Sequence, residues 1–287
     1  MSIECFLTGV GKDKFLLNLA TSQNGIIHQP ELGRNEKIKP FDNAFWPTFN
    51  KREWTKNPIA VIGTLRGTHE LIQLAMQRKH TFYYLDHAYF HATRNYVPGP
   101  HGRLYRMIRS QLQLNYNVML EDEDWKRIKK YGEPKRPKEF VKQGSEILII
   151  PPTEAIARVY GFDVPYWLEK TQRDIRAFTD KVIRIRYKDT DIPLQESLKN
   201  AYCVVAFQST VAIEAILSGI PCIVDPISQA KPVSSTTIAD IEELYYPTED
   251  EIMLWQYSLL ACQFTENEFK TGEAYEATNR LQHDNWI

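Results

Sequence analysis

The stretch that decides the fold is Tyr202–Pro226, which reads YCVVAFQSTVAIEAILSGIPCIVDP. It opens with Tyr202–Phe207, an apolar run rich in valine and aromatic residues, which predicts a strand buried on both faces. A helix with one apolar face follows, and Gly219 occupies the position where glycine commonly ends a helix. Ile220–Val224 is a second apolar run. A strand, a helix and a strand in this order predict two parallel, neighbouring strands.

The turn between that first strand and the helix predicts a phosphate-binding site. Gln208, Ser209 and Thr210 form this turn at the carboxyl end of the strand. The start of a helix points N–H groups and a positive dipole end toward such a position, which suits a phosphate. The two hydroxyl groups add donors, and Glu214, one helical turn further on, is within reach of ribose hydroxyls. The alternative is an ordinary capped helix with Glu214 facing solvent.

The run QSTVAIEAILSGIPCIVDP (208–226) resembles the donor-binding segment of GT-B glycosyltransferases, in which a serine–threonine pair holds the donor phosphates and a glutamate often holds the ribose. Further similarity, to small glycosyltransferase-like proteins of tailed phages, covers most of residues 59–275. It is strongest in EILIIPPTEAIARVYG (146–161), FTDKVIRIRYKD (178–189) and the tail IEELYYP…LACQFTENEFKTGEAY (241–275).

This resemblance implies an α/β, GT-B-like fold with two Rossmann-like parallel-sheet domains that face a cleft. It also implies a nucleotide-diphosphate sugar, such as a UDP-sugar, as co-substrate, without a further cofactor. Some of the similar phage enzymes glycosylate hydroxymethylated pyrimidines in viral DNA. The resemblance therefore implies double-stranded DNA with a flipped base as the acceptor.

Composition sets the bounds. A chain of 287 residues is long enough for one large domain or two small ones. The formal net charge of −1 gives no global attraction to nucleic acid, so a DNA contact requires a local basic patch. We expect a cytoplasmic protein with reduced thiols, because the sequence shows no membrane-length apolar run and no signal-peptide pattern, and its cysteines form no CxxC pair. The cysteines are Cys5, Cys203, Cys222 and Cys262.

The expected domain boundary lies near Phe140–Gly144, where a charged, proline-containing stretch gives way to the predicted strand Ile147–Ile150. This assigns residues 1–142 to an acceptor-binding domain and residues 143–287 to a nucleotide-sugar-binding domain, whose last helix is expected to cross back. Further helices are predicted at 165–178, 193–200, 250–262 and 264–275. The basic run 126–142 is read as a solvated loop or linker.

The N-terminal half contains a second strand–helix–strand pattern. Ile59–Gly63 and Phe82–Leu85 are predicted strands that flank the helix His69–Arg78. Arg66 and Gly67 lie in the turn after the first of these strands, a position where an acceptor or phosphate can bind. Nearer the start, residues 3–8 are predicted as an edge strand. The following GVGKDK (9–14) lacks the full phosphate-loop motif, so a simple turn is expected.

Asp86 and His87 follow the second strand of that pattern. A carboxylate or an imidazole at this position can act as the general base that removes a proton from an acceptor hydroxyl. The alternative is structural: Asp86 caps a helix or pairs with a nearby arginine, and His87 packs in place.

A basic stretch with interleaved tyrosines comes next, without acidic residues among its arginines. In a helix, Arg103, Arg106 and Arg109 would share one face, where they could contact a phosphate backbone while tyrosines stack on bases. Arg106 and Arg109 are therefore candidate acceptor or phosphate contacts. A domain interface or binding of the donor's own phosphates are the alternatives. The full stretch also includes Arg94, Tyr96, Tyr105 and Tyr116.

The predicted strand 182–187 leads into the cationic residues Arg184, Arg186 and Lys188. Such side chains can neutralise the diphosphate as it leaves, and Lys188 is the first candidate, followed by Arg186. Pairing of Arg184 with an acid is the structural alternative. Asp189-Thr190-Asp191 matches a DxD metal motif only superficially, so we expect a capping loop and metal-independent transfer.

Together these features favour a glycosyltransferase that moves a hexose or pentose to modified phage DNA. Two other readings stay open: a transferase that acts on surface polysaccharide of the capsule type, and a non-catalytic module that binds nucleotides or nucleic acid.

Overall fold

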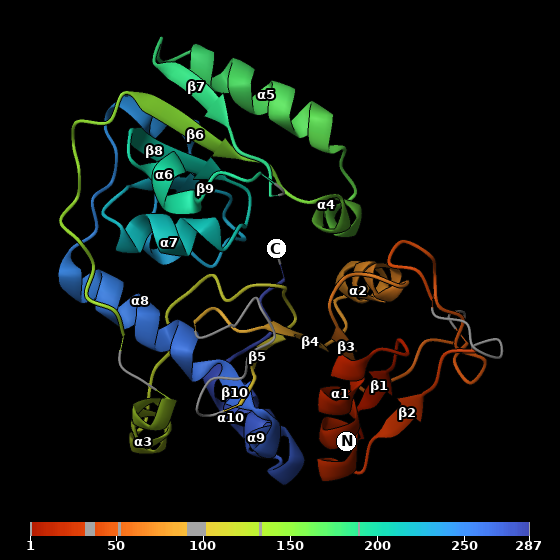
Figure 1. Cartoon of the computed structure of the whole chain (residues 1–287). Coiled ribbons are helices and arrows are strands. Elements are labelled where there is room, and N and C mark those ends of the chain that lie inside the picture. The colour runs from red at the N-terminus through yellow and green to blue at the C-terminus, as the bar shows by residue number, and fades with distance from the viewer. Residues whose placement is uncertain are drawn as a thin grey trace. The chain divides into compact units, whose positions relative to one another are not determined.

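The computed structural model describes residues 2–31, 38–50, 53–90, 102–131, 134–188 and 190–286 (Figure 1). The chain divides into two compact α/β units. Unit 1 comprises Met1–Leu112, Val118–Arg127 and Leu260–Ile287, and unit 2 comprises Gln113–Asn117 and Ile128–Leu259. Residues 128–142, which the sequence assigns to the N-terminal domain, thus group with unit 2, whereas residues 260–287 group with unit 1.

Unit 1 contains a sheet of strand order β10-β5-β4-β3-β1-β2. The four strands from β4 to β2 are parallel, and β5 and β10 are antiparallel to their neighbours. The predicted strands at 59–63 and 82–85 are confirmed. The edge position predicted for the first strand is wrong, because the short strand β2 pairs with its outer side. The strands are β1 (Glu4–Phe6), β2 (Ile26–His28), β3 (Ile59–Ile62), β4 (Phe82–His87), β5 (Leu104–Arg109) and β10 (Gln263–Thr265).

The helices of unit 1 come from both ends of the chain. Near the start, α1 packs against α9 from the C-terminal segment. The single helix predicted at 264–275 is wrong: Thr265 caps a new helix by accepting from the N–H of Glu268 (3.3 Å), and Gly272 (φ 92°) separates it from the next. The helices are η1 (Gly11–Asp13), α1 (Lys14–Ser22), α2 (Thr68–Gln77), α9 (Glu266–Thr271) and α10 (Glu273–Leu281).

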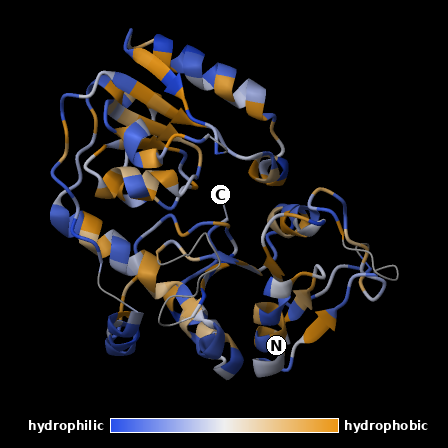
Figure 2. Cartoon of the chain, viewed as in Figure 1, coloured by the Kyte–Doolittle hydropathy of each residue, from blue (hydrophilic) through white to orange (hydrophobic). Residues whose placement is uncertain are grey.

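The first part of the basic run 126–142, which is predicted to be a loop or linker, belongs to the helix α3 (Asp122–Tyr131), which Figure 2 shows as mostly hydrophilic. Acidic residues fill its first turn and lysines its last turn, an order that suits the helix dipole. Asp124 anchors it, because both carboxylate oxygens accept from Arg280 (2.6 and 2.9 Å).

Unit 2 contains a parallel sheet of strand order β7-β6-β8-β9. The predicted strand–helix–strand unit is confirmed: β8 and β9 are adjacent and parallel, with Val204 opposite Cys222, and α7 connects them. The strands are β6 (Glu146–Ile150), β7 (Val182–Ile185), β8 (Ala201–Ala206) and β9 (Cys222–Val224). The helices are α4 (Glu154–Tyr160), α5 (Val164–Arg176), α6 (Leu194–Leu198), α7 (Val211–Leu217), η2 (Lys231–Val233), η3 (Ile238–Glu242) and α8 (Glu249–Ala261).

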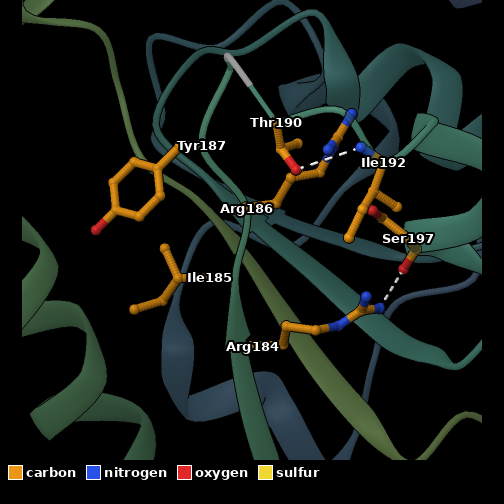
Figure 3. Close-up of a pocket in the computed structure, with 7 residues that line it drawn as sticks. All are labelled: Arg184, Ile185, Arg186, Tyr187, Thr190, Ile192 and Ser197. Carbon is orange, nitrogen blue, oxygen red and sulfur yellow. Dashed lines mark hydrogen bonds between the residues drawn. The ribbon is translucent and has the colours of Figure 1, made fainter.

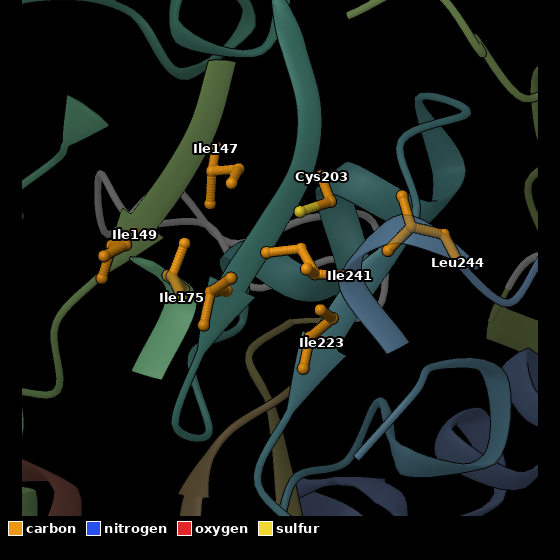
Figure 4. Packing of buried hydrophobic residues seen from close by; sticks show 8 residues of the cluster. Ile147, Ile149, Ile175, Cys203, Ile223, Ile241 and Leu244 are labelled. Carbon is orange, nitrogen blue, oxygen red and sulfur yellow. The ribbon is translucent and has the colours of Figure 1, made fainter. Parts of the chain in front are cut away.

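Helical segments cover both faces of this sheet. On one face, Ile147 and Cys203 pack with Ile175 of α5 and Ile241 of η3 (Figure 4). On the other face α7 packs against β8 and β9, where the Cys222 thiol lies 3.8 Å from the Ala212 carbonyl oxygen. Coverage of both faces explains why the strands read as continuous apolar runs in the sequence. The α/β class with two largely parallel sheets is therefore confirmed.

The polar segment after β9 is more tightly packed than its composition indicates. Ser228 and Gln229 are fully buried, and Ser235 exchanges backbone hydrogen bonds with Cys222 and Val224 (3.1 and 2.9 Å). These contacts hold the segment firmly against the sheet of unit 2. Among the described residues, no helix has both the length and the hydropathy needed to cross a bilayer.

Candidate functional site

The strand order of unit 2 reverses between β6 and β8. From β6 the chain runs through α4 and α5 to β7 on one side, and then returns to β8 on the other side. In open parallel sheets, ligands bind at the carboxyl ends of the strands where the order reverses. The loops at this point are 151–153 after β6 and 207–210 after β8, so the predicted phosphate-binding turn lies at the topological switch point.

The turn holds a set of hydrogen-bond donors. Ser209 is fixed from two sides, because its carbonyl accepts from Gln229 Nε2 (2.8 Å) and its Oγ accepts from the N–H of Val211 (3.2 Å). Among the described residues, the backbone N–H groups of Ser209 and Thr210 and the Thr210 hydroxyl donate no hydrogen bond. Both residues are partly exposed.

The hydrogen bonds of the neighbouring N–H groups show which donors are left for a phosphate. The N–H groups of Val211, Ala212 and Ile213 are already bonded within the turn (3.0–3.2 Å). The N–H groups of Ser209 and Thr210 can therefore donate to a phosphate, whereas those in the first turn of α7 are already engaged. Glu214 lies partly exposed in the first turn of α7.

Gln208 begins the turn and is only 5% exposed; its amide atoms make no hydrogen bond of good geometry among the described residues, but they lie close enough to the Tyr160 hydroxyl to lower the pKa of that group. Buried polar atoms in native proteins normally have partners. Aromatic side chains lie next to Gln208. The ring of Phe207 packs against those of Tyr160, Phe162 and Trp167 at centroid distances of 5.4, 4.9 and 6.4 Å. A planar group with one donor and one acceptor fits this environment.

Two further polar residues near this turn escaped the sequence analysis. Burial raises the pKa of Tyr160, and the nearby Asp225 charge raises it further. Burial also raises the pKa of Asp225, although the N–H of Ile227 donates to its carboxylate (3.2 Å). The signal that could have found Asp225 is its place directly after β9, at the same carboxyl edge as Gln208.

Two of the cations predicted near the leaving group, Arg184 and Arg186, line a separate pocket, whereas Lys188 does not. This pocket has a volume of about 320 Å³ and lies at the end of β7 (Figure 3). Arg184 pairs with Glu146 (2.9 Å), which confirms the structural alternative for this residue. Arg186 has a buried Nη1 without a hydrogen-bond partner in the described part of the chain, and Lys188 is exposed. The lining residues are Arg184, Ile185, Arg186, Tyr187, Thr190, Ile192 and Ser197.

The structure does not bring these cations into contact with Ser209 and Thr210. β6 separates β7 from β8, so the two strand ends lie two strand spacings apart, roughly 10 Å. A ligand that reaches both Arg186 and Thr210 must therefore extend across the end of β6.

In unit 1, Asp86 is held in a structural ion pair. Its Oδ2 accepts from Arg106 Nη2 (3.2 Å) and from the Tyr84 hydroxyl (2.9 Å), and its Oδ1 accepts from the N–H of His87 (2.8 Å). Burial acts to raise the pKa of Asp86, but the charges of Arg106 and Lys12 outweigh it, so the pKa lies below its ordinary value. A carboxylate with a lowered pKa is a weak proton acceptor.

His87 is the better proton acceptor of the two predicted candidates. Its side chain is exposed, and its ring lies against Tyr105 at a centroid distance of 5.1 Å. Partial burial lowers the pKa of His87 and the Asp86 charge raises it, while Lys12 and Arg106 lower it again, so that the net shift is downward. The imidazole is therefore mostly neutral at pH 7 and able to accept a proton.

The turn with Arg66 and Gly67 packs against the loop of residues 38–44. Arg66 has a left-handed backbone (φ 60°), and its Nε donates to the Ile38 carbonyl (2.9 Å). At Gly67 (φ 85°) a Cβ atom would lie 2.9 Å from the backbone nitrogen of Ala44. These contacts fix residues 38–44, and a role of Arg66 or Gly67 in acceptor binding stays a prediction.

The predicted helical arginine stripe is wrong, because Arg106 and Arg109 belong to the strand β5. Spacing of three places them on opposite faces of a strand, so they cannot form one row. The Arg106 side chain is 6% exposed and engaged with Asp86, and Arg109 forms a two-pronged pair with Asp284 (2.9 and 3.0 Å). Both arginines serve internal contacts. Arg94 and Tyr96 lie outside the described residues.

Within the described ranges, no group of three or more His, Cys, Asp or Glu side chains is arranged to hold a metal ion. Asp189 of the DxD-like triplet lies outside those ranges.

No protein-family model matches the sequence, and no curated protein matches it. Among solved structures, the chain is similar to two described as Thermosulfurimonas dismutans KpsC. One is the beta Kdo 2,4 transferase, with 10% identity, a TM-score of 0.45, and coverage of 89% of this chain and 90% of that one. The other is the beta Kdo 2,7 transferase, with 12% identity, a TM-score of 0.48, and coverage of 97% and 99%.

Proposed function

We propose that the protein is a glycosyltransferase whose unit 2 binds a nucleotide-diphosphate sugar. The observation that carries this proposal is the position of Gln208, Ser209 and Thr210 at the strand-order reversal of unit 2, where the N–H groups of Ser209 and Thr210 donate to no other group in the described part of the chain. The resemblance of residues 208–226 to GT-B donor-binding segments supports the same assignment.

Each residue of the turn has a proposed role toward the donor. The N–H groups of Ser209 and Thr210 and the Thr210 hydroxyl bind the diphosphate, because oxyanions form strong hydrogen bonds with converging donors. Glu214 binds the ribose hydroxyls. Gln208 pairs its amide with the base or the ribose, with UDP as the expected nucleotide. Arg186 and Lys188 stabilise negative charge at the far end of the ligand.

The transfer step requires a proton acceptor and charge stabilisation. As the acceptor hydroxyl attacks the anomeric carbon, its proton passes to a base, and the bond from that carbon to the diphosphate oxygen breaks. The electron pair stays on the departing diphosphate, whose charge the cations and N–H groups stabilise. We assign the base role to His87, with Asp86 as the residue that holds its backbone.

A saccharide hydroxyl is the better supported acceptor. The arginines on which the modified-DNA hypothesis depended, Arg106 and Arg109, are engaged in ion pairs within unit 1. A transferase that acts on surface polysaccharide needs no basic stripe. Hydroxymethylated pyrimidines in DNA remain the second candidate, on the resemblance to phage proteins.

Donor binding is tested by titration calorimetry of the full chain with UDP and other nucleoside diphosphates. The variant T210V loses the Thr210 hydroxyl contact to a charged group, worth about 1.5–3 kcal/mol, so we expect at least tenfold weaker binding. The matched control is T236V, because Thr236 is an exposed hydroxyl residue of the same unit. Equal affinity of the variant and the wild type, or no binding of any nucleotide, would contradict the proposal.

Catalysis is tested by nucleotide release from UDP-sugars in the presence of oligosaccharides or hydroxymethylcytosine DNA. We expect release with a saccharide acceptor, and a loss of at least a hundredfold in H87A, in line with removal of a general base. Release with DNA alone would restore the DNA hypothesis. Donor binding without turnover on any acceptor would indicate a non-catalytic module.

A further inference from the structure

The loop after β1 closes around its own carboxylate. Asp13 Oδ2 accepts from the N–H groups of Thr8 (2.8 Å), Gly9 (2.7 Å) and Val10 (3.1 Å), and the Thr8 hydroxyl donates to Oδ1 (3.1 Å). An arrangement of consecutive N–H groups of this kind often binds a phosphate. Here the Asp13 carboxylate already accepts from these N–H groups. The loop is therefore fixed, and it holds the backbone on both sides of Lys12.

The Lys12 side chain crosses the carboxyl end of β3. Gly63 directly follows that strand with φ +69°, and a Cβ atom there would lie 2.9 Å from Lys12 Nζ. The N–H of Gly63 donates to the carbonyl of Leu85 (2.8 Å), the residue before Asp86. The ammonium group is thereby placed at the shared carboxyl edge of β1, β3 and β4.

This edge is the strand-order reversal of unit 1. From β1 the chain runs to β2 on one side, and later to β3 on the other side. Ligands favour such a position in an open α/β sheet. Lys12 lies in η1, which follows β1, and His87 is the last residue of β4.

The local charge is positive. Asp86 and Arg106 neutralise each other in their ion pair. Lys12 is partly buried, and within the described residues it makes no hydrogen bond or ion pair. The other groups that act on His87 are Arg103, which adds positive charge, and the Tyr105 ring against which it lies. The Asp86 carboxylate attracts Lys12 but is already paired with Arg106, so the partly buried ammonium beside the neutral imidazole is suited to bind a further anion.

We propose that Lys12 and His87 form an oxyanion site in unit 1 that binds a carboxylate or phosphate group of the acceptor. The inference rests on the proposed function and narrows it: the acceptor is an acidic molecule, whose anionic group binds Lys12 while its reacting hydroxyl lies beside His87. Lys12 is then a positioning residue. Gly63 has a left-handed backbone (φ +69°) that favours glycine, and its missing Cβ also leaves space beside the ammonium group.

The test follows the His87 ring by NMR on the histidine-labelled full chain during titration with inorganic phosphate and, separately, with acetate. Comparison with H87Q assigns the signals. We expect a saturable shift of the His87 ring in the wild type, at least tenfold weaker binding in K12M, and recovery in K12R. The pKa of His87 is expected to rise in K12M, because a positive neighbour is removed.

The control is K14M, since Lys14 lies two residues away and pairs with Glu266 outside this edge. A response to phosphate, to acetate or to both supports the site and tells which oxyanion it prefers. No response to either anion, or equal binding by K12M, overturns the inference. UDP affinity, measured by calorimetry on the same variants, is expected to be unchanged in K12M. Failure of donor binding and failure of the oxyanion site are thereby distinguishable.

Discussion

Replacement of Asp86 by asparagine tests the structural role of its ion pair with Arg106. In the structure, Asp86 neutralises Arg106, whose side chain is 6% exposed and whose other contacts are the His87 carbonyl and the rings of Tyr84 and Tyr89. D86N keeps the size of the side chain and removes its charge. The guanidinium group then remains buried without a counter-charge, and the folded state is destabilised.

The magnitude follows from the burial of the pair. Removal of one partner from a buried ion pair costs about 3–5 kcal/mol, because the remaining charge stays desolvated. The Asp86 side chain is 26% exposed, so we expect the lower end, about 3 kcal/mol. The double variant D86N/R106M removes both charges and is expected to recover more than half of this loss. By contrast, H87A is expected to cost less than about 1 kcal/mol, since His87 is exposed.

The assay is urea denaturation followed by far-UV circular dichroism, with the four proteins measured in one buffer at pH 7. The reasoning predicts that D86N has the lowest midpoint and that the double variant lies between D86N and the wild type. A loss below about 1 kcal/mol in D86N, or a double variant no more stable than D86N, would refute the structural role of the ion pair.

Three further predictions concern other sites. Burial acts to raise the pKa of Asp124, but the Arg280 contact outweighs burial, and the pKa lies below its ordinary value. The ionised carboxylate therefore stabilises the fold above about pH 4, and this stabilisation is lost as the pH falls further. In acid denaturation, the stability of D124N is expected to fall less steeply with decreasing pH than that of the wild type. G219A is expected to lose more than about 2 kcal/mol in urea denaturation, because φ is +79° and a Cβ would lie 2.1 Å from the Glu139 carbonyl oxygen. Burial raises the pKa of Cys203 and of Cys262 to about 12, so a thiol reagent at pH 8 is expected to modify them only after unfolding.

The sequence predicts the sheet of unit 2 well because its strands are buried on both faces. Runs such as Ile147–Ile150 and Tyr202–Phe207 are continuous and apolar, and glycine and proline mark their ends. The switch-point position of Gln208–Thr210 follows once the order of strands and helices is known. The sequence therefore locates the candidate donor turn, but not which of its N–H groups remain available.

The sequence predicts unit 1 less completely, because its sheet joins distant segments. β5 carries arginines three residues apart, a spacing that fits a helix as well as a strand, and only pairing with β4 and β10 decides between them. The pairing of Arg106 with Asp86 was open in the sequence for the same reason. Lys12 stood in a motif that lacked the full phosphate-loop pattern, and its approach to Gly63 depends on contacts between separate strands.

The central claim is that the turn Gln208–Thr210 binds the donor diphosphate, and a crystal structure of the protein with UDP tests it most directly. The account predicts diphosphate oxygens within about 3.2 Å of the N–H groups of Ser209 and Thr210 and of the Thr210 hydroxyl. A diphosphate bound at another edge, such as that of Lys12, with the turn of unit 2 empty, would contradict it.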